Sequence, residues 1–541
     1  MRLNDEGRRC KMDTGLDYVF AGFPLSSDHW SKLTDFLSQP TSDYIEKKVD
    51  WKIYDAMKSL LNRNSSGNKE LLEIMEQAAK DERITKRFNF PMKQYENVAP
   101  FLDSERPPFL WNSKYKEARE FVRVEVLPKM DVTLNTLDIN KGEDVQRAFS
   151  NLNASAGAVC PRAKKKDVLD KIVEVAKFMM EFPEHGNLPA LTFKRSQISG
   201  FIKHGKLAPE LIKYKYRLVW CVDAATVLVE ALYARPLMDE VLPRMINYAG
   251  GKSDAIIGKN LLAWWKQTHS WICFDYSQYD STVPSWLIRD MFSLVKPYFK
   301  REDWSTLEWV CDKFINTKLI MPDGVLVEKH KGIPSGSYFT QLIGTLCNIQ
   351  VMLTAFIARY GLNETKRKLI SYSGNVMLMA MGDDNVVFCR GDIDTKWVVS
   401  YIRKNFGLVI NRDKCDEGGN GDYPVFLKRQ WRERGAWRDI KELLVQMTHS
   451  ESHRRYDNYT PWHIIYGYYL TYPLAFEDVI DIEEVIRNMG ESDVGIKGLL
   501  DVRLSDLPGS LRYLAISSPA RWRRMVKAAE EHYVALKEHS A

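Results

Sequence analysis

The sequence predicts a mixed α+β fold in which helices predominate and the strands form small antiparallel sheets. Apolar runs at 377–380 and 386–389 have the length of short strands, and the Gly-Asp-Asp-Asn segment 382–385 between them has turn chemistry. This stretch therefore predicts a β-hairpin with two aspartates at its tip. Helical spacing of apolar residues over 286–298 and through most of 437–541 supplies the α component.

Composition narrows the class of protein. The chain has 541 residues, of which 45% are apolar and 27% charged, which is typical of a globular protein and argues against disorder. The net charge of +6 favours a basic channel over a basic coat. Eight cysteines without a Cys-x-x-Cys pair indicate reduced thiols rather than zinc ligands or disulfides. No run reaches about 18 apolar residues, so we expect no membrane partner.

The first region with chemical character is a basic strand. Residues 1–110 carry no catalytic motif, and we expect them to be structural. In segment 212–220, Lys213, Lys215 and Arg217 alternate with largely apolar residues, so a strand would place the three cations on one face. Such a row suits a triphosphate or a nucleic-acid backbone, although an ordinary exposed strand shows the same pattern.

Two aspartates then stand at a strand end and a helix start. An apolar run ends at Asp275, and Asp280 lies in the turn before Pro284 and the helical pattern 286–298. Aspartates in such places are commonly helix caps. Their neighbours in the fold must decide whether they do more.

A loop rich in glycine and serine, 331–337, precedes a long predicted helix. On a helical wheel, the apolar stripe of that helix lies opposite Thr340, Gly344 and Asn348. Glycine in mid-helix costs about 1 kcal/mol relative to alanine, so Gly344 indicates close approach by another backbone or by a ligand. The alternative is that Thr340 and Asn348 merely face water.

The segments after the hairpin are less informative about chemistry. The pattern predicts a helix over 395–406 that ends at Gly407, and a strand over 426–431. A last helix over 520–537 begins with a basic turn, which either contacts RNA or is simply solvated.

Three acidic residues, Asp275, Asp383 and Asp384, are thus predicted at strand ends or turns. Magnesium prefers oxygen ligands and is commonly held by one or two carboxylates together with substrate phosphates. Two such ions can activate an attacking hydroxyl and stabilise the leaving oxygen of an in-line displacement. A cationic strand would neutralise a triphosphate. Together these features predict a nucleotidyl-transfer site.

The same residues carry a family resemblance, which covers residues 190–435. Three segments resemble palm motifs A, B and C of viral RNA-dependent RNA polymerases, in order: Asp275-x4-Asp280, Ser335-Gly336-x3-Thr340-x7-Asn348 and Gly382-Asp383-Asp384. Three others resemble motifs F, D and E: Lys213 with Lys215 and Arg217, Phe406 through Lys414, and Phe426-Leu427-Lys428-Arg429. The amino-acid sequence around motifs A and B is similar to that of polymerases from partitiviruses, which are small double-stranded RNA viruses. Picobirnaviruses are near relatives of partitiviruses.

The resemblance implies roles for the acidic residues and for one lysine. Asp275 and Asp383 would be the principal ligands of Mg²⁺, or alternatively of Mn²⁺, and Asp384 would support or join them. Lys414 would be the acid that protonates the leaving pyrophosphate. Lys428 and Arg429, in the hairpin of motif E, would bind RNA.

The resemblance also implies a ribose pocket. Asp280 would sense the 2′-hydroxyl of the incoming nucleotide. Ser335, Thr340 and Asn348 would line the ribose side, and Gly336 would let the loop flex. Many positive-strand RNA virus polymerases place the ribose-sensing asparagine nine residues after the motif B serine, where this chain has Gly344. The partner of Asp280 is therefore left open.

The implied fold is a right hand with fingers, a palm that contains a small antiparallel sheet, and a helical thumb. The expected division has four parts: an N-terminal extension that bridges fingers and thumb (1–110), fingers (111–262), palm with a finger insertion at about 290–330 (263–436), and thumb (437–541).

The implied activity is template-directed RNA synthesis from ribonucleoside triphosphates, for replication and transcription of a viral RNA genome. Template RNA, product RNA and a capsid protein would be the partners, in the host cytoplasm and inside the virion. One alternative is a reverse transcriptase, against which Asp280 speaks because a carboxylate there welcomes a 2′-hydroxyl. The other is an inactive RNA-binding or capsid-associated protein, against which the retained carboxylates speak.

Overall fold

The structure is a computed structural model. It describes residues 44–46, 49–63, 68–81, 84, 86–88, 92–161, 163–184, 188–199, 202–203, 206–208, 213–268, 270–321, 325–419, 421–449, 456, 459–492 and 519–540. Helices form most of this part, and its strands belong to sheets of two to four strands. The predicted α+β class with small, mainly antiparallel sheets is confirmed.

A four-stranded antiparallel sheet stands at the centre of the fold, in the order β11-β12-β7-β14. Its strands are β7 (Ser270–Cys273), β11 (Leu378–Met381), β12 (Asp384–Cys389) and β14 (Asp416–Gly419). The predicted hairpin is therefore present as β11 and β12, which close at residues 382–383.

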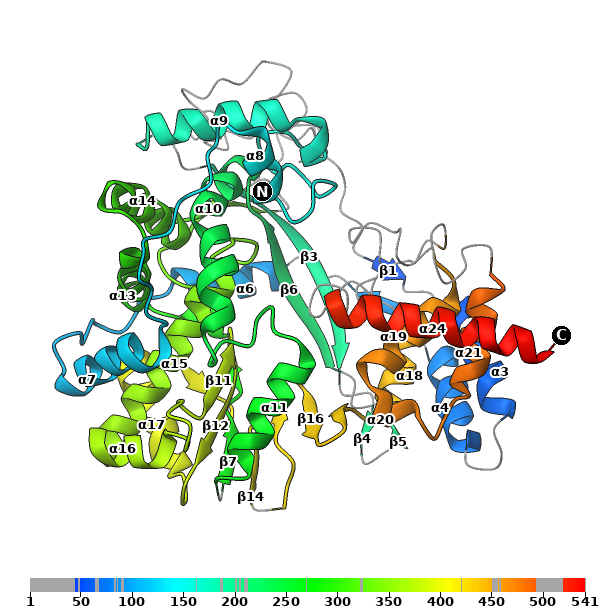
Figure 1. Ribbon diagram of the computed structural model, residues 1–541. Coiled ribbons are helices and arrows are strands. Elements are labelled where there is room, and N and C mark those ends of the chain that lie inside the picture. Colours follow the sequence, from blue (N-terminus) through cyan, green and yellow to red (C-terminus); the bar gives the residue numbers. More distant parts are fainter. Residues whose placement is uncertain are drawn as a thin grey trace, which may run out of the picture.

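The two faces of this sheet are covered differently. Alternate residues of a strand point to opposite faces. Val387 of β12 joins the large core that contains α15 (Thr340–Tyr360), whereas Phe388 joins a smaller core with α11 (Asp254–Trp265). Figure 1 shows α11 beside the sheet strands. Because both faces are buried, the strands are apolar almost throughout.

Helix α15 runs through the large core. Its residues 342–357 are all buried, including the polar residues Thr345, Asn348 and Gln350, so the alternative in which Asn348 merely faces water is wrong. The helix has the length and mean hydropathy (1.5) of a membrane span, but 89% of that stretch is buried inside the protein. These values therefore reflect a core helix.

The predicted basic strand is β6 (Lys213–Cys221), which pairs with β3 (Ala190–Ser199) in a second four-stranded sheet. Figure 1 shows this long pair crossing the middle of the molecule. The register sets Lys215 opposite Gln197 and Arg217 opposite Arg195. The side chains of residues 213–217 lie outside the described part of the chain, so only their place on one strand face is established.

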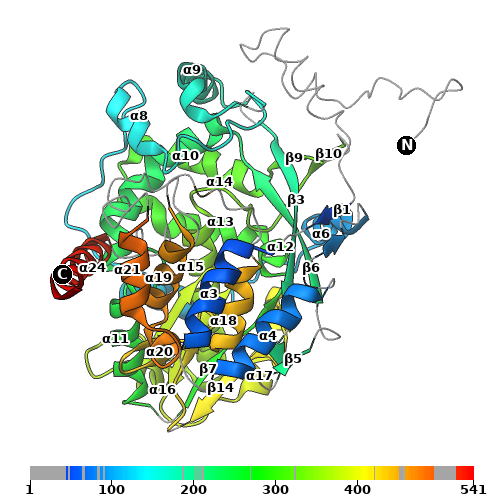
Figure 2. The same cartoon turned by 90° about the vertical axis from the view of Figure 1, so that its right-hand side faces the viewer.

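The N-terminal helices α3 (Trp51–Arg63) and α4 (Lys69–Lys80) lie beside C-terminal helices (Figures 1 and 2). They share one hydrophobic core with four of them: α18 (Ile440–Thr448), α19 (Pro461–Thr471), α21 (Ile482–Gly490) and α24 (Pro519–Ser540). The Asn68 amide donates a hydrogen bond of 3.1 Å to the carbonyl oxygen of Val479. The predicted last helix is thus confirmed, and N-terminal residues complete its core.

Candidate active site

The sheet brings Asp275 to the tip of the hairpin. Strand β7 lies beside β12, and the Phe274 N–H donates to the Asn385 side-chain oxygen at 3.3 Å. Asp275 follows Phe274, and Asp384 precedes Asn385. The two acidic residues, far apart in the sequence, are therefore at adjacent strand ends. Asp275 and Asp384 are partly buried, while Asp383 is exposed.

The turn that carries Asp383 is held in an unusual backbone conformation. Gly382 has φ +63°, a left-handed value that favours glycine. Its N–H donates to the Thr345 hydroxyl of α15 at 2.9 Å. Met381 and Asp384 pair across the turn, which leaves only residues 382 and 383 at the tip. The sequence offered no signal for Thr345, because its partner lies on another element.

Asn348 supports the same turn from below. Its amide donates to the carbonyl oxygens of Gly382 at 2.9 Å and Asp383 at 3.1 Å. Its own oxygen accepts from the Asn385 amide at 3.2 Å. The side chain is fully buried. It therefore braces the hairpin in this structure, and its expected contact with a ribose stays a prediction.

Gly344 confirms the expected close approach of another backbone. A Cβ built on it would lie 3.6 Å from the Gly382 Cα and 3.3 Å from the Ile333 Cδ1. The Tyr279 hydroxyl also donates to the Gly344 carbonyl oxygen at 2.7 Å. Absence of a side chain at this position lets α15 lie directly under the hairpin turn.

Lys414 lies beside Asp275, as the sequence predicts for two groups of one site. The Lys414 Nζ is 3.9 Å from the Asp275 Oδ2, and both side chains are about half exposed (55% and 44%). The Asn411 N–H donates to the Asp275 carbonyl oxygen at 2.8 Å and so holds this segment in place. Lys414 closes a short 3-10 turn, residues 412–414.

A further carboxylate, Asp416, was missed by sequence reasoning. It pairs with Cys273 across β14 and β7. The residue is exposed overall, but desolvation of its carboxyl group, and then the negative charge of Asp275, raise the pKa of Asp416 above its ordinary value. Only the strand register places it here, and no local motif marks it.

The donors of this site suit a divalent cation in chemistry and charge. Carboxylate oxygens are the ligands that magnesium prefers. Burial, and after it the nearby Asp275 carboxylate, raises the pKa of Asp416, so two carboxyl groups lie close together here. In the described part of the chain, no three His, Cys, Asp or Glu side chains are grouped closely enough to hold a metal ion. Asp275, Asp383 and Asp384 therefore stay predicted ligands.

The loop before α15, residues 332–338, is tied to the Asp280 segment. The Ile333 N–H donates to the Asp280 carbonyl oxygen at 2.6 Å, and the Gly332 N–H donates to the Val283 carbonyl oxygen at 2.9 Å. Asp280 itself lies in the one-turn helix α12 (Tyr279–Thr282) and is exposed. Two backbone hydrogen bonds therefore join the 332–338 loop to motif A.

The predicted ribose-pocket residues of this loop are placed as follows. Ser335 is partly buried and Gly336 is exposed. Gly336 has φ +91°, and a Cβ on it would lie 2.9 Å from the Trp220 carbonyl oxygen, so only glycine fits without a shift. The Thr340 hydroxyl donates to the Pro334 carbonyl oxygen at 2.5 Å, which closes the loop onto the start of α15.

The segment expected as one strand over 426–431 is a hairpin instead. Strand β15 (Val425–Phe426) pairs with β16 (Arg429–Arg432) around Leu427 and Lys428, which both have left-handed φ values, +54° and +57°. The local pattern missed this turn because no glycine marks it, whereas the hairpin that the resemblance to motif E implied is present. Lys428 at its tip is exposed.

Arg429 requires a correction, because its side chain is only 9% exposed and is not presented to RNA. Its Nη1 donates to both oxygens of Asp254 on α11, each at 3.0 Å, and its guanidinium lies 5.3 Å from the Tyr472 ring centroid. The guanidinium thus joins the hairpin to α11 inside the protein. The prediction that Arg429 contacts RNA is therefore wrong.

Comparison with known proteins supports the interpretation of these motifs. Residues 71–471 match the model of the viral RNA-dependent RNA polymerase family. The RNA-directed RNA polymerase of Cryptosporidium parvum virus 1 (strain KSU-1) is 25% identical over 359 residues, which are 63% of this chain and 60% of that protein. The non-structural polyprotein 1AB of Ovine astrovirus 1 is 30% identical over 180 residues, 31% of this chain and 12% of that protein. The chain thus spans less than two thirds of the length of each of these relatives.

The fold has a solved counterpart. The crystal structure of the RNA-dependent RNA polymerase of a human picobirnavirus is similar with a TM-score of 0.54 and 15% identity, over 93% of this chain and 94% of that chain. This likeness confirms the right-hand fold that the resemblance implied. The family match extends over well more than half of the sequence and includes every motif of the carboxylate site. This chain belongs to the viral RNA-dependent RNA polymerase family.

Proposed function

We propose that this chain synthesises RNA on an RNA template from ribonucleoside triphosphates, at the site formed by Asp275, Asp383 and Asp384. The observation that carries the proposal is the bonded pair Phe274–Asn385, which puts acidic residues from two distant motifs at adjacent strand ends. Membership of the family and the right-hand fold support it.

The reaction is displacement at the α-phosphorus of the incoming nucleotide by the 3′-hydroxyl of the growing strand. The hydroxyl loses its proton, the new ester bond forms and the bond to pyrophosphate breaks. Divalent magnesium, when bound, supplies positive charge to the attacking and leaving oxygens. Asp275 and Asp383 would hold it, with Asp384 in support. Lys414, charged beside Asp275, would give its Nζ proton to the departing pyrophosphate.

Selection of ribonucleotides is assigned to the Asp280 segment. The Asp280 carboxylate would accept a hydrogen bond from the 2′-hydroxyl of the nucleotide. Ser335 and Thr340 would line the same pocket, and Gly336 would let the loop adjust. Asn348 contributes by holding the hairpin turn. A site that hydrogen-bonds a substrate hydroxyl strongly disfavours an analogue that lacks it.

Contacts with RNA and triphosphate are assigned to cationic side chains. Lys213, Lys215 and Arg217 share one face of β6 and would neutralise phosphates, and Lys428 would touch the product strand. We further propose a capsid protein as partner and the host cytoplasm and virion as the place of action.

The proposed division of the chain follows the right hand. Residues 111–262 would form the fingers, 263–436 the palm with an insertion at about 290–330, and 437–541 the thumb. Residues 1–110 would bridge fingers and thumb. The core that α3 and α4 share with the C-terminal helices supports the thumb side of that bridge.

The test is incorporation of labelled ribonucleotides by the purified full chain on an RNA template with magnesium. We expect synthesis by the wild type and none by Asp383→Ala. Asp392→Ala removes an exposed aspartate beyond the far end of β12 and should leave synthesis unchanged. Equal labelling by wild type and Asp383→Ala would place the chemistry elsewhere. Preference for deoxynucleotides would instead favour reverse transcription.

A further inference from the structure

The 332–338 loop is held at its two ends by buried charged side chains that the proposed chemistry does not use. At its beginning stands Lys329, which is fully buried. The Lys329 Nζ donates to the carbonyl oxygens of Phe314 at 2.6 Å, Ile315 at 2.8 Å and Gly332 at 2.7 Å. Burial lowers the pKa of Lys329 well below its ordinary value, and its amino group ties the start of the loop to the end of α14 (Trp304–Ile315).

At the other end stands Glu230, in helix α10 (Ala224–Pro236), with only 3% of its surface exposed. Its Oε2 accepts the Tyr338 N–H at 2.9 Å, and the same carboxylate takes a hydrogen bond from the Ser337 side chain. Burial raises the pKa of Glu230 to about 7, while these two hydrogen bonds lower it. Both bonds of the carboxylate go to the end of the loop.

The ring of Tyr338 is fixed next to this contact. Its hydroxyl donates to the Ala148 carbonyl oxygen at 2.5 Å and accepts from the Arg235 guanidinium at 3.0 Å. The guanidinium also lies 4.9 Å from the ring centroid. Helix α10 thus holds Tyr338 by its backbone through Glu230 and by its ring through Arg235.

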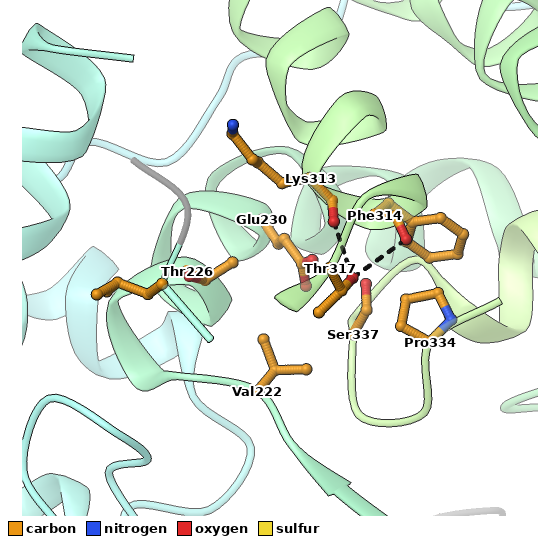
Figure 3. Close-up of a pocket in the computed structure, with 9 residues that line it drawn as sticks. Val222, Thr226, Glu230, Lys313, Phe314, Thr317, Pro334 and Ser337 are labelled. Atoms are coloured by element: carbon orange, nitrogen blue, oxygen red, sulfur yellow. Dashed lines mark hydrogen bonds between the residues drawn. The ribbon is translucent and has the colours of Figure 1, made fainter. Parts of the chain in front are cut away.

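A small cavity lies behind the loop at the same place (Figure 3). Its volume is about 10 Å³, room for about one water molecule. Glu230, Thr226, Thr317 and Ser337 line it, and the Thr226 hydroxyl is buried without a hydrogen-bond partner. Ser337 therefore has space to move if the carboxylate releases it.

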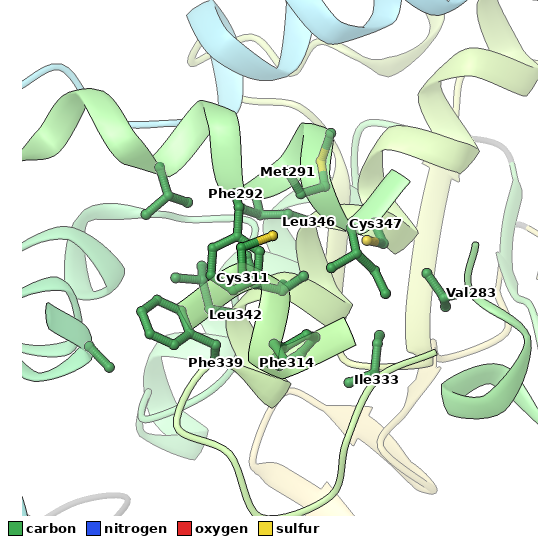
Figure 4. Packing of buried hydrophobic residues seen from close by; sticks show 14 of the residues in the cluster. Val283, Met291, Phe292, Cys311, Phe314, Ile333, Phe339, Leu342, Leu346 and Cys347 are labelled. Carbon is green, nitrogen blue, oxygen red and sulfur yellow. The ribbon is translucent and has the colours of Figure 1, made fainter. Parts of the chain in front are cut away.

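Beyond Tyr338 the chain enters the rigid core shown in Figure 4. Phe339 is fully buried, and its ring lies 5.1 Å from that of Phe292, centroid to centroid. The segment between the two anchors, Lys329 and Glu230, is therefore short and runs from Ile333 to Gly336. Hydrogen bonds of Ile333 to Asp280 and of Thr340 to Pro334 hold it between them.

We propose that Glu230 is a positioning residue for RNA synthesis: its buried carboxylate holds Ser337 and Tyr338 so that the 332–338 loop supports the nucleotide pocket. The inference rests on the proposed function. The loop reaches the pocket in two ways, because it carries Ser335 and because its Ile333 N–H bonds the Asp280 carbonyl oxygen. A displaced loop would shift both groups and weaken nucleotide binding.

Other charges near Glu230 are directed elsewhere. Lys313 of α14 lines the same cavity, but its ammonium turns away from Glu230 in Figure 3 and lies 3.8 Å from the Asp312 carboxylate. Arg235, on the same helix as Glu230, contacts Tyr338. The remaining residues that line the cavity are uncharged. No charged group among the residues that line the cavity forms a close ion pair with Glu230. Hydrogen bonds from the loop therefore offset the free-energy cost of burying its carboxylate.

The first test reads the loop directly, by hydrogen exchange of the full chain at the Tyr338 amide. Glu230→Met removes both hydrogen bonds at similar size and should speed exchange there by about tenfold or more. Glu230→Gln keeps an acceptor and should give a smaller change. Thr226→Val, one turn earlier and lining the same cavity, should exchange like the wild type. If Glu230→Met fails to fold, Glu230→Gln carries the comparison.

The second test measures KM and kcat for ribonucleotides. We expect the KM for ribonucleotides to rise about tenfold in Glu230→Met, with a smaller fall in kcat and unchanged template binding. As the pH falls from 8 to 6, the KM of the wild type should approach that of Glu230→Gln, because protonation weakens the Glu230 carboxylate as a hydrogen-bond acceptor. Unchanged exchange or an unchanged KM in the folded variants would overturn the proposal. If the wild type makes no RNA, the proposed function fails, and hydrogen exchange still decides whether Glu230 holds the loop.

Discussion

The amide of Asn385 donates a hydrogen bond of 3.2 Å to the side-chain oxygen of Asn348, and both side chains are buried next to the Asp383 turn. Asn385 also bonds the backbone of Phe274, and Asn348 bonds the carbonyl oxygens of the turn. Two amides thus join motif A, the hairpin and α15. Neutral side chains thus hold the backbone segments that carry the acidic residues.

Loss of the Asn348 amide should cost both stability and activity. Asn348→Ala leaves two carbonyl oxygens of the turn without this donor, so we expect the free energy of unfolding to fall by about 2–3 kcal/mol. RNA synthesis by the folded fraction should fall as well, because Asp383 loses its support. Thr354→Val, on the same helix but away from the turn, should lose about 1 kcal/mol or less and keep its rate. Denaturant unfolding and primer extension measure the two effects. A normal rate in folded Asn348→Ala would show that the brace is dispensable.

Lys414 should affect rate without affecting stability. Its ion pair with Asp275 is long (3.9 Å) and half exposed, and such pairs contribute little to folding. Lys414→Leu should lower kcat by about 100-fold or more if the ammonium protonates pyrophosphate. Arg412→Leu, an exposed neighbour in the same 3-10 turn, is the control and should behave like the wild type. Single-turnover rates test this, and equal rates for the two variants would remove Lys414 from the mechanism.

Lys428 and Arg429 are adjacent but should behave in opposite ways. Arg429→Met leaves the Asp254 carboxylate unpaired in a nearly buried place, so we expect a loss of about 3–5 kcal/mol in unfolding free energy. Lys428→Ala should leave stability unchanged and weaken RNA binding, with a smaller dependence of affinity on salt. Thermal unfolding and RNA titrations at two salt concentrations separate the two effects. Equal stability of both variants would contradict the ion pair.

The free energy of unfolding should depend on pH because Glu230 titrates. Its pKa of about 7 in the folded protein exceeds the ordinary value, so the folded state binds the proton more tightly than the unfolded state. Stability should therefore fall as the pH rises from about 4.5 to about 7, by roughly 3 kcal/mol for this group, and stay level above. Glu230→Gln removes this dependence. Unfolding of both proteins at pH 5, 6, 7 and 8 measures the difference, which should favour the variant increasingly as the pH rises. Parallel curves would mean that Glu230 does not titrate in this range.

Elements with local signals could be predicted from the sequence. The helix over 395–406 has its bounds in the structure because both ends carry their own cap: the Asp394 carboxylate accepts the Trp397 N–H at 3.2 Å, and Gly407 takes a left-handed φ of +76°. The hairpin of the two aspartates is equally local, since a turn sequence separates two apolar runs.

Features that depend on distant partners could not be predicted. A helical wheel with Gly344 indicates a close approach on the Asn348 side of α15, but it does not show which element approaches or that Asn348 braces the hairpin turn. Asp416 joins the site only through its pairing with Cys273. Glu230 gave no signal at all, because its partners lie over a hundred residues away. The turn at Leu427 and Lys428 was missed for another reason, since neither residue is typical of a left-handed backbone.

The core that α3 and α4 share with the C-terminal helices sets an order of events during synthesis. The Asn68–Val479 hydrogen bond joins residues 411 positions apart, and the apolar faces of both N-terminal helices are buried in large part by residues made much later. On the ribosome these faces emerge before α18 to α21 and stay partly uncovered until those helices follow. Contacts of such long separation form slowly and expose aggregation-prone surface in the meantime. Helices α3 and α4 are therefore vulnerable to aggregation until the C-terminal helices that share their core have been made.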